Sequence, residues 1–403
     1  MATTKIIPGV LDLNEATSES GLKMPSGTEF NRPATDVAGM VRNNTNETSD
    51  SSASCEEYYN GAAWKKINNV VIPPEKVFKL LNWTGTAAEK TVTGFGNQPD
   101  LVLIKNYDTS SNSDPWYWFD STRGATKYLQ SASSAAEGTD AQTLKSFNND
   151  GFVLGTNDTV NGSGHNTLGF SFRASGGVTS SNTNGTITST VQANNETGLS
   201  IVSFTGNATN STVGHGLNAT PEFIIIKNRD SVGSWLTWGD VYGGGDKYMY
   251  LDSTNDVQTQ TQFFNGTVPT STVFSIGTHP DVNTNGNEII AYCFTPQSSY
   301  SKFGSYSGSG SQGSPSVNVG FKPDLLIVKR ITGGAEQWWV GNSATNSSDH
   351  WTEWMPLQSN ERLQSDTIHS ITVTSNGFEP YGTSGLVNAS GSSYLYLAFK
   401  INS

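Results

Sequence analysis

The chain of 403 residues carries little charge, and this scarcity excludes several classes of partner. Charged residues make up 14% of the sequence, and 23 Lys and Arg against 35 Asp and Glu give a net charge of −12. Because such a protein repels phosphate groups, we expect no nucleic-acid partner. The sequence also lacks an apolar run of membrane-spanning length and a signal-peptide core at its polar start, so we expect no membrane insertion.

Cysteine and histidine are also scarce. Two cysteines exclude a disulfide-rich scaffold and leave one conceivable bridge, between Cys55 and Cys293. Cys293 aligns with Ser171 and Ala398 of the repeats described below, which indicates a packing residue. The five histidines show no metal-ligand spacing, and the sequence has no phosphate-binding loop and no Gly-x-Ser-x-Gly motif. We therefore expect no enzyme, no metal site and no cofactor.

One enzymatic alternative needs no recognisable motif. Polysaccharide hydrolysis requires two carboxylates flanking the bond, and distant loops can supply them. Asp120 and Glu137 are the candidate pair, although surface acids without a catalytic role are the simpler interpretation.

What the sequence does contain is an internal triplication. A proline and a carboxylate, four apolar residues and a lysine occur in order at residues 99–105, 221–227 and 323–329. Apolar residues that do not alternate predict a strand buried on both faces, and proline suits the first position of such a strand. These strands are therefore expected at the centre of each repeat.

Further anchors recur at nearly fixed distances from these strands. An aromatic and a hydroxyl residue precede a first glycine in each repeat, at Gly85, Gly206 and Gly308. A second glycine lies 17 residues before a closing phenylalanine each time, in the pairs Gly155 and Phe172, Gly277 and Phe294, and Gly382 and Phe399. Such spacing indicates three copies of one supersecondary unit of about a hundred residues.

The first 75 residues differ from the repeats. They contain scattered prolines and no sustained hydrophobic period, which predicts an extended arm that orders against another chain or particle. Within residues 57–67 we expect two short strands with Asn60-Gly61 as a tight turn. An isolated hairpin is marginally stable, so partner chains are expected to bury it, and we expect a homotrimer.

Several segments resemble proteins of bacteriophage particles. Residues 22–28, 32–33, 39–45 and 59–64 are similar to a module found near the N-termini of tail-fibre and other virion structural proteins, of marine phages especially. A Ser- and Asp-rich insertion, residues 47–54, interrupts that module. Residues 118–129 and 149–152 resemble a phage domain of uncharacterised role, and such domains are similar to lectin-like β-sandwiches.

The expected fold class is therefore all-β, with three lectin-like β-sandwich repeats after an arm and a β-hairpin. The expected domains are residues 1–75, 76–174, 199–297 and 298–403, and residues 175–198 have linker composition. The short joint between the second and third repeats predicts close packing of those two and a more independent first repeat.

Ligand selectivity is expected in the variable segments after each lysine, where aromatic residues lead to an acidic or amide residue. Aromatic faces stack on sugars while carboxylates bond hydroxyl groups. The candidate ligand-binding residues are Trp116, Trp118, Asp120, Trp235, Trp238, Asp240, Trp339, Trp351 and Trp354. The pattern places Trp118, Trp238 and Trp339 at one position of the repeat, and core packing is the alternative for all of these tryptophans.

Residues 281–286 imitate the start of a calcium loop, but Tyr292 stands where the last ligand should be. A polar turn is therefore the better interpretation.

The resulting hypothesis is a virion structural protein, assembled in the host cytoplasm, that presents its repeats for host recognition. The surface polysaccharide of the host is the expected ligand, and a trimer would multiply weak sugar contacts. The alternatives are a decoration protein that binds no ligand and a polysaccharide-degrading tailspike. Attachment to other virion proteins and oligomerisation are assigned to Met24, Pro25, Met40, Arg42, Tyr59 and Trp64.

Overall fold

A computed structural model describes residues 77–107, 114–298 and 300–401, together with four short strands at residues 26–27, 41–44, 55–59 and 64–66. The chain divides into two compact units, Met1–Val71 and Ile72–Ser403. Each unit is described by itself below.

The N-terminal unit contains a four-stranded sheet in the order β1-β2-β3-β4. Its strands are β1 (Ser26–Gly27), β2 (Val41–Asn44), β3 (Cys55–Tyr59) and β4 (Trp64–Lys66). β1 pairs parallel with β2, and the other pairs are antiparallel. β3 and β4 form the predicted hairpin, but Tyr59 pairs with Trp64, so four residues separate the strands rather than Asn60-Gly61 alone.

The residues predicted for attachment fall largely outside the described part of this unit. Met24, Pro25 and Met40 lie outside the described residues. Arg42, Tyr59 and Trp64 lie in strands whose side chains are not described.

The second unit consists of three repeats with one strand order. The first repeat has a six-stranded sheet, β10-β9-β8-β7-β13-β5, and a three-stranded sheet, β11-β12-β6. Its elements are β5 (Phe78–Thr84), β6 (Lys90–Thr93), β7 (Leu101–Asn106), β8 (Tyr117–Asp120), β9 (Lys127–Gln130), β10 (Gly138–Thr139), β11 (Leu144–Asn148), β12 (Gly151–Leu154), α1 (Asp158–Asn161) and β13 (Asn166–Phe172).

The second repeat has the same large sheet with two strands added at its edge, in the order β14-β15-β16-β23-β18-β19-β20-β21, and a two-stranded sheet, β17-β22. Its elements are β14 (Ser180–Asn182), β15 (Ser189–Asn194), β16 (Leu199–Thr205), β17 (Ser211–Gly214), β18 (Phe223–Asn228), β19 (Leu236–Gly239), η3 (Asp240–Tyr242), β20 (Lys247–Tyr250), β21 (Gln258–Thr259), α2 (Thr261–Phe264), β22 (Val273–Ile276), α3 (Pro280–Asn283) and β23 (Glu288–Phe294).

The third repeat has a six-stranded sheet, β24-β33-β26-β27-β29-β30, and a four-stranded sheet, β25-β32-β31-β28. Its elements are β24 (Ser301–Ser307), β25 (Val317–Asn318), β26 (Leu325–Arg330), β27 (Trp339–Asn342), β28 (His350–Trp351), β29 (Glu353–Pro356), β30 (Gln364–Ser365), β31 (Ile371–Thr374), β32 (Gly377–Pro380) and β33 (Ser393–Phe399). The all-β, sandwich-type prediction is confirmed, and the shared strand order supports the triplication.

The strands that begin after proline are buried on both faces, as predicted. Every residue of β7 and β18 is buried, and β26 has two half-buried residues. In β7, Val102 and Ile104 pack inside the sandwich of the first repeat, whereas Leu101 and Leu103 enter a second core. Residues of all three repeats meet in this second core, which we call the shared core.

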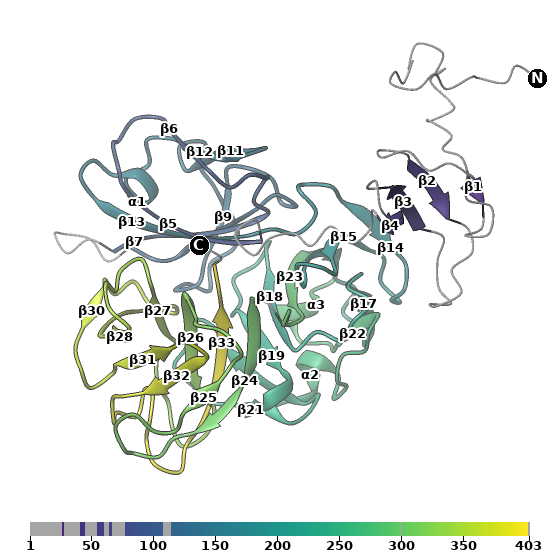
Figure 1. The fold of residues 1–403 in the computed structure, drawn as a ribbon. Helices are drawn as coiled ribbons and strands as arrows, with labels where there is room; N and C mark the ends of the chain where they lie inside the picture. The colour runs from purple at the N-terminus through teal and green to yellow at the C-terminus, as the bar shows by residue number, and fades with distance from the viewer. Residues whose placement is uncertain are drawn as a thin grey trace, which may run out of the picture. The chain divides into compact units, whose positions relative to one another are not determined.

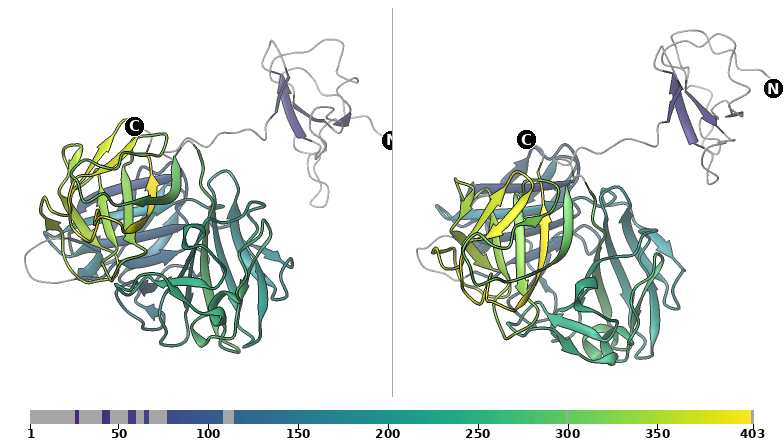
Figure 2. Two further views of the ribbon diagram at one scale, coloured as in Figure 1. Left: turned by 90° about the horizontal axis from the view of Figure 1, so that it is seen from below. Right: turned by 60° about the horizontal axis from the view of Figure 1, so that its bottom comes forward.

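The shared core corrects the expectation of a more independent first repeat. The closing phenylalanines of the three repeats all lie in it, and the ring of Phe172 is 5.1 Å from that of Phe399 and 6.1 Å from that of Phe294. The three repeats are thus lobes of one body, coloured blue, green and yellow along the chain (Figures 1 and 2). Residues 175–198 are more than a linker, since β14 and β15 extend the sheet of the second repeat.

The first glycine of each repeat recurs because backbone segments approach closely there. A Cβ on Gly85, Gly206 or Gly308 would lie 2.1–2.3 Å from a carbonyl oxygen of the loop before the closing strand. A side chain at these positions would force that loop away, which explains why glycine is kept in all three repeats.

Candidate functional site

The predicted ligand-binding tryptophans lie in the interior. Asp240 is exposed, but the other eight predicted residues are buried: Trp116, Trp118, Asp120, Trp235, Trp238, Trp339, Trp351 and Trp354. A ring that is 0–4% exposed offers no face on which a sugar could stack. The burial favours the packing alternative for these tryptophans and corrects their assignment as a surface platform.

Strand pairing also corrects which tryptophans are equivalent. Trp118 faces Leu103, and the residues in that place in the other repeats are Thr237 and Val340 rather than Trp238 and Trp339. The tryptophans at one position of the repeat are Trp116, Trp235 and Trp338, the last of which the sequence analysis did not select. The backbone oxygen of each accepts a hydrogen bond from the residue that follows β9, β20 or β29.

These three tryptophans link the repeats into a closed ring. The indole Nε1 of Trp235 donates to the carbonyl of Gln130 in the first repeat at 2.9 Å, and Trp338 donates to Tyr250 in the second at 3.1 Å. Trp116 completes the ring by donating to Pro356 in the third repeat at 3.2 Å. The three acceptors are equivalent residues, so each repeat binds its neighbour in the same way.

Two of the lysines that close the central strands bond across the same joints, whereas Lys105 bonds to the carbonyl of Asp114 in its own repeat. Lys227 donates to the carbonyl of Ser134 in the first repeat, and Lys329 donates to Thr254 in the second. Burial lowers the pKa of Lys105 to about 7 and the pKa values of Lys227 and Lys329 to about 8. These ammonium groups are therefore structural and lie within the body.

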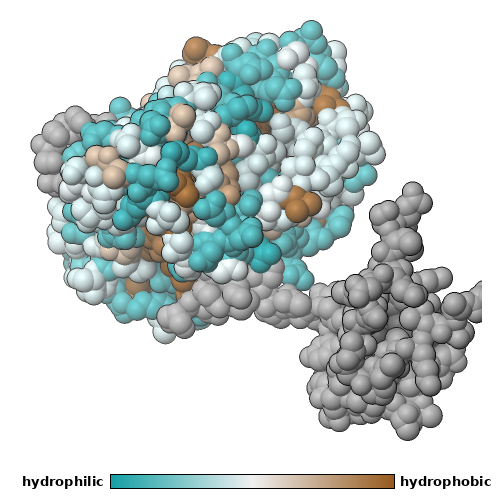
Figure 3. Space-filling model, turned by 90° about the horizontal axis from the view of Figure 1, so that it is seen from above, coloured by the Kyte–Doolittle hydropathy of each residue, from teal (hydrophilic) through white to brown (hydrophobic). Residues whose placement is uncertain are grey.

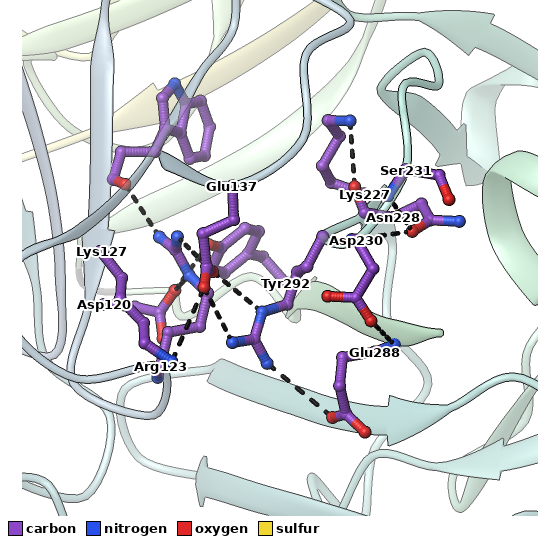
Figure 4. A network of polar contacts seen from close by, with 12 residues as sticks. Asp120, Arg123, Lys127, Glu137, Lys227, Asn228, Asp230, Ser231, Glu288 and Tyr292 are labelled. Atoms are coloured by element: carbon purple, nitrogen blue, oxygen red, sulfur yellow. Dashed lines mark hydrogen bonds and ion pairs between the residues drawn. The ribbon is translucent and has the colours of Figure 1, made fainter. Parts of the chain in front are cut away.

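A network of charged side chains lies at the joint between the first and second repeats (Figure 4). Arg123 pairs with both Asp120 and Glu137, and Arg229 binds Glu137 through two nitrogen atoms at 2.9 and 3.0 Å. The Tyr292 hydroxyl donates to Asp120 at 2.7 Å. Burial alone would raise the pKa of Glu137, but its bonds to Arg229 and the nearby charge of Arg123 hold that pKa below its usual value.

This network does not suit Asp120 and Glu137 as a hydrolytic pair. A general acid needs a carboxyl group that stays protonated near neutral pH and reaches the substrate. The carboxylate of Asp120 is fully buried, and the lowered pKa of Glu137 keeps that group ionised. The two carboxylates hold the joint together instead.

Each repeat also contains a buried asparagine that is not among the residues predicted from the sequence. Asn161, Asn283 and Asn388 are completely buried, and each bridges the loop after the first glycine to the strand before the helix or turn. Asn283 donates to the carbonyls of Thr209 and Gly277, both at 2.7 Å. A Val-Asn pair six residues after each second glycine was the available signal.

The hydrogen bonds of Asn283 give a structural role to residues 281–286, the segment that imitates the start of a calcium loop. Residues 280–283 form helix α3, and the amide of Asn283 is occupied by backbone groups. Among the described residues, no group of three His, Cys, Asp or Glu side chains is placed to hold a metal ion.

A polar pocket on the third repeat is the candidate binding site. Its volume is 460 Å³, and its lining combines hydroxyl, amide, carboxylate and ammonium groups from the start of β26, the loop between β27 and β28, and the end of β33. Trp351 contributes to the wall but is 1% exposed. Of the predicted residues, Trp351 is the one that this pocket includes.

Two aspartates shape the pocket. The carboxylate of Asp324 accepts from the Ser343 hydroxyl at 3.0 Å and from the Ile401 amide at 2.7 Å. Asp349 pairs with Lys322 at 2.6 Å on the exposed rim. A volume of this size is within the usual range of small-molecule sites, which are commonly concave and have a few fixed polar groups.

The face of the body drawn in Figure 3 is mostly hydrophilic, with hydrophobic residues in small separate patches. In the described part of the chain, no helix is long and apolar enough to cross a membrane. That face thus offers mainly polar groups.

The fold and its joints define the class of protein: three β-sandwich repeats closed around a shared core. Residues 73–402 match the model of a family described as a domain of unknown function, DUF7483, and the chain belongs to that family. Neither the curated proteins nor the solved structures include a match to this chain.

Proposed function

We propose that this chain is a structural protein of a phage particle, a tail fibre or another appendage, that recognises glycans on the host surface. The resemblance of residues 22–64 to a fibre module supports attachment to other virion proteins through residues 1–75. The polar pocket beside Asp324 is the observation that carries the recognition role, because its hydroxyl, amide and carboxylate groups suit a sugar. The proposed location is the virion, after assembly in the host cytoplasm.

A glycan array probed with the full-length chain tests recognition. We expect binding to a subset of host-surface polysaccharides. Binding to none of them would contradict the recognition role and leave the particle role to be tested separately.

Deletion of residues 1–75 tests attachment. The variant should fold in its three repeats and fail to enter particles, whereas normal incorporation would contradict the attachment role. The homotrimer belongs to the same proposal, and a monomeric mass of the intact chain by light scattering would remove it.

A decoration protein without ligand binding is the second candidate. The burial of the predicted tryptophan platforms favours it, since those rings serve the cores of the body. A tailspike that cleaves polysaccharide is less well supported, because Asp120 and Glu137 are held by Arg123. Release of reducing ends from host polysaccharide would nevertheless support that activity.

A further inference from the structure

The third repeat departs from the other two at one edge of its small sheet. β28, which consists of His350 and Trp351, adds a strand that the small sheets of the other repeats lack (Figure 1). Trp351 pairs with Ile371 of β31, and both side chains pack in the core of the repeat. Because side chains alternate along a strand, His350 and its partner Thr372 lie on the outer face of this sheet.

A second departure is an extra residue after β32. Phe378 and Gly382 are separated by three residues, whereas the equivalent phenylalanine and glycine of the other repeats are separated by two. The extra residue is Tyr381, since the amides of Tyr381 and Gly382 both donate to the carbonyl of Ser370, at 3.0 and 2.8 Å. Two successive residues that face one partner form a bulge, and a bulge commonly redirects a side chain.

A third departure lies beside this bulge. The carbonyls of Gln142, Gln262 and Ile368 occupy one position of the repeat, because each accepts an amide hydrogen from the residue two positions after the second glycine. Both glutamines are exposed, and Ile368 takes their place with 59% of its side chain exposed. A Cβ on Gly382 would lie 2.1 Å from the carbonyl oxygen of Ile368, so the backbone of Ile368 lies close to that of Tyr381.

These changes bring an aromatic ring to the surface. Among the side chains described in residues 77–107, 114–298 and 300–401, Tyr381 is the only aromatic one that is exposed. Its ring centre lies 4.6 Å from that of His350, and the two ring planes meet at 80°. The tyrosine thus reaches from the end of β32 to β28, which are the two places where the small sheet differs from its counterparts.

A row of polar side chains borders the ring. Val373 and Phe378 face the core, so Thr372 and Glu379, which pair across β31 and β32, lie on the outer face with His350. The imidazole Nδ1 of His350 lies 2.9 Å from the hydroxyl of Thr372. A hydroxyl and a carboxylate placed side by side can accept hydrogen bonds from two hydroxyl groups of a ligand.

The combination of one exposed ring and a polar row suits a sugar. The ring can stack on the C–H groups of a sugar while the row bonds its hydroxyl groups. A protein partner commonly buries about 1,200–2,000 Å² around an apolar centre, whereas Ile368 and Tyr381 are the large apolar residues that the described part of the third repeat exposes. The carboxylate of Glu379 and the net charge of −12 disfavour an acidic sugar.

We propose that the outer face of the small sheet in the third repeat binds an uncharged sugar, which stacks on Tyr381 and bonds Thr372 and Glu379 through its hydroxyl groups. Ile368 extends the apolar contact, and His350 holds the ring of Tyr381 and the hydroxyl of Thr372 in place. The inference rests on the proposed glycan recognition and adds a second site to it, since none of these residues lines the polar pocket beside Asp324.

A glycan array that carries neutral and acidic glycans tests the inference with the full-length chain and its variants. We expect the parent chain to bind neutral glycans. Tyr381→Ala should weaken this binding about tenfold or more, as loss of a central aromatic contact commonly does. Tyr381→Phe keeps the ring and should bind like the parent chain.

Two further variants serve as controls. Val232 is 76% exposed on the second repeat, so Val232→Ala removes an apolar surface group elsewhere and should leave binding unchanged. Ile368→Gln introduces the residue of the other repeats and should weaken binding less than Tyr381→Ala does. The substituted side chains are all exposed, and an unchanged urea midpoint confirms that each variant is folded.

The outcomes separate this inference from the proposed function. Binding that survives Tyr381→Ala, or binding confined to acidic glycans, would overturn the inference while glycan recognition stands. A Tyr381→Ala chain that binds glycans normally but fails to enter particles would assign this face to a protein contact and overturn the inference as well. A blank array would overturn both the inference and the proposed recognition.

Discussion

At the scale of the residue, buried tryptophans in this protein have two different roles. Trp116 packs on Phe170 and also donates its indole hydrogen to Pro356 of another repeat. Trp118 packs against Trp235 in the same core, yet its Nε1 has no hydrogen-bond partner. Burial alone therefore does not tell which tryptophan fixes the contact between repeats.

This difference predicts unequal costs for one substitution at the two sites. Trp116→Phe and Trp118→Phe both remove similar ring volume, but the first also leaves the carbonyl of Pro356 unpaired. We expect Trp116→Phe to lower the free energy of unfolding by about 1–3 kcal/mol more than Trp118→Phe does. Urea unfolding of both variants measures this, and equal losses would show that the indole bond contributes nothing.

The role of a residue could be predicted from the sequence where the three repeats align at its position. The burial of Cys293 agrees with its predicted packing role, since Ser171 and Ala398 occupy its place elsewhere. The equivalence of Trp118, Trp238 and Trp339 was wrong because the spacing from the lysine differs between repeats. The equivalent tryptophans are Trp116, Trp235 and Trp338. This follows from the strand register, which the sequence alone does not give.

At the scale of the element, two equivalent joints between repeats use different side chains. The joint between the first and second repeats is ionic, and the joint between the second and third is apolar at the same place. The amide of Glu137 donates to the carbonyl of Arg229, and the amide of Val257 donates to the carbonyl of Ile331 in the equivalent joint. The backbone contact is thus kept while its side chains change from an ion pair to two aliphatic groups. We therefore expect Glu137 and Arg229 to stabilise the joint only when both side chains are present.

A double-mutant cycle tests this dependence. Glu137→Val should destabilise strongly because it leaves Arg123 and Arg229 without a shared carboxylate, and Arg229→Ile should do so less. The double variant should lose less than the sum of the single losses, with a coupling of about 0.5–3 kcal/mol in the free energy of unfolding. Additive losses would mean that the two side chains act independently.

Elements were predictable where their own residues carried the signal. The strands after each proline are apolar on both faces, so the sequence indicated their place at the centre of each repeat. The composition of β14 and β15, largely Ser, Thr, Asn and Gln, predicts a linker, but these strands are held in the sheet by the pairing of β14 with β15 and of β15 with β16. The shared core could not be predicted from the sequence. A strand face that packs against another repeat has the same apolar pattern as a face that packs inside its own sandwich.

At the scale of the whole molecule, the buried lysines predict how stability varies with pH. Their pKa values of about 7 to 8 lie below that of an exposed lysine, so the unfolded chain binds more protons between about pH 7 and 10. The penalty for burying these groups as cations is complete below pH 7 and is relieved as pH rises. Stability should therefore increase from pH 7 toward pH 9.5.

The urea midpoint measured between pH 6 and 9.5 checks this expectation. Lys105→Met should flatten the rise, because it removes one of the three groups. Above pH 10 the trend should reverse, since burial raises the pKa values of Tyr242, Tyr292 and Tyr306 and only the unfolded chain ionises them readily. A midpoint that falls between pH 7 and 9.5 would contradict the assignment.

The shared core also predicts that the three repeats unfold together. Trp116→Phe, in the first repeat, should reduce hydrogen-exchange protection of β7, β18 and β26 alike, because the ring of indole bonds joins all three sheets. Calorimetry should show one transition for the body. Loss of protection confined to β7 would indicate that the repeats open separately.

The ring of indole bonds makes no use of the peptide links between repeats. Each donor meets an acceptor on a neighbouring lobe, and Phe78 at the beginning of the body lies 5.5 Å from Phe399 at its end. Three separate polypeptides of one lobe each could form the same contacts. A gene encoding a single lobe could thus have preceded this one, with a product that associated with itself to form the same body. Fusion of three copies would then have made assembly independent of protein concentration and allowed the outer loops of each lobe to diverge.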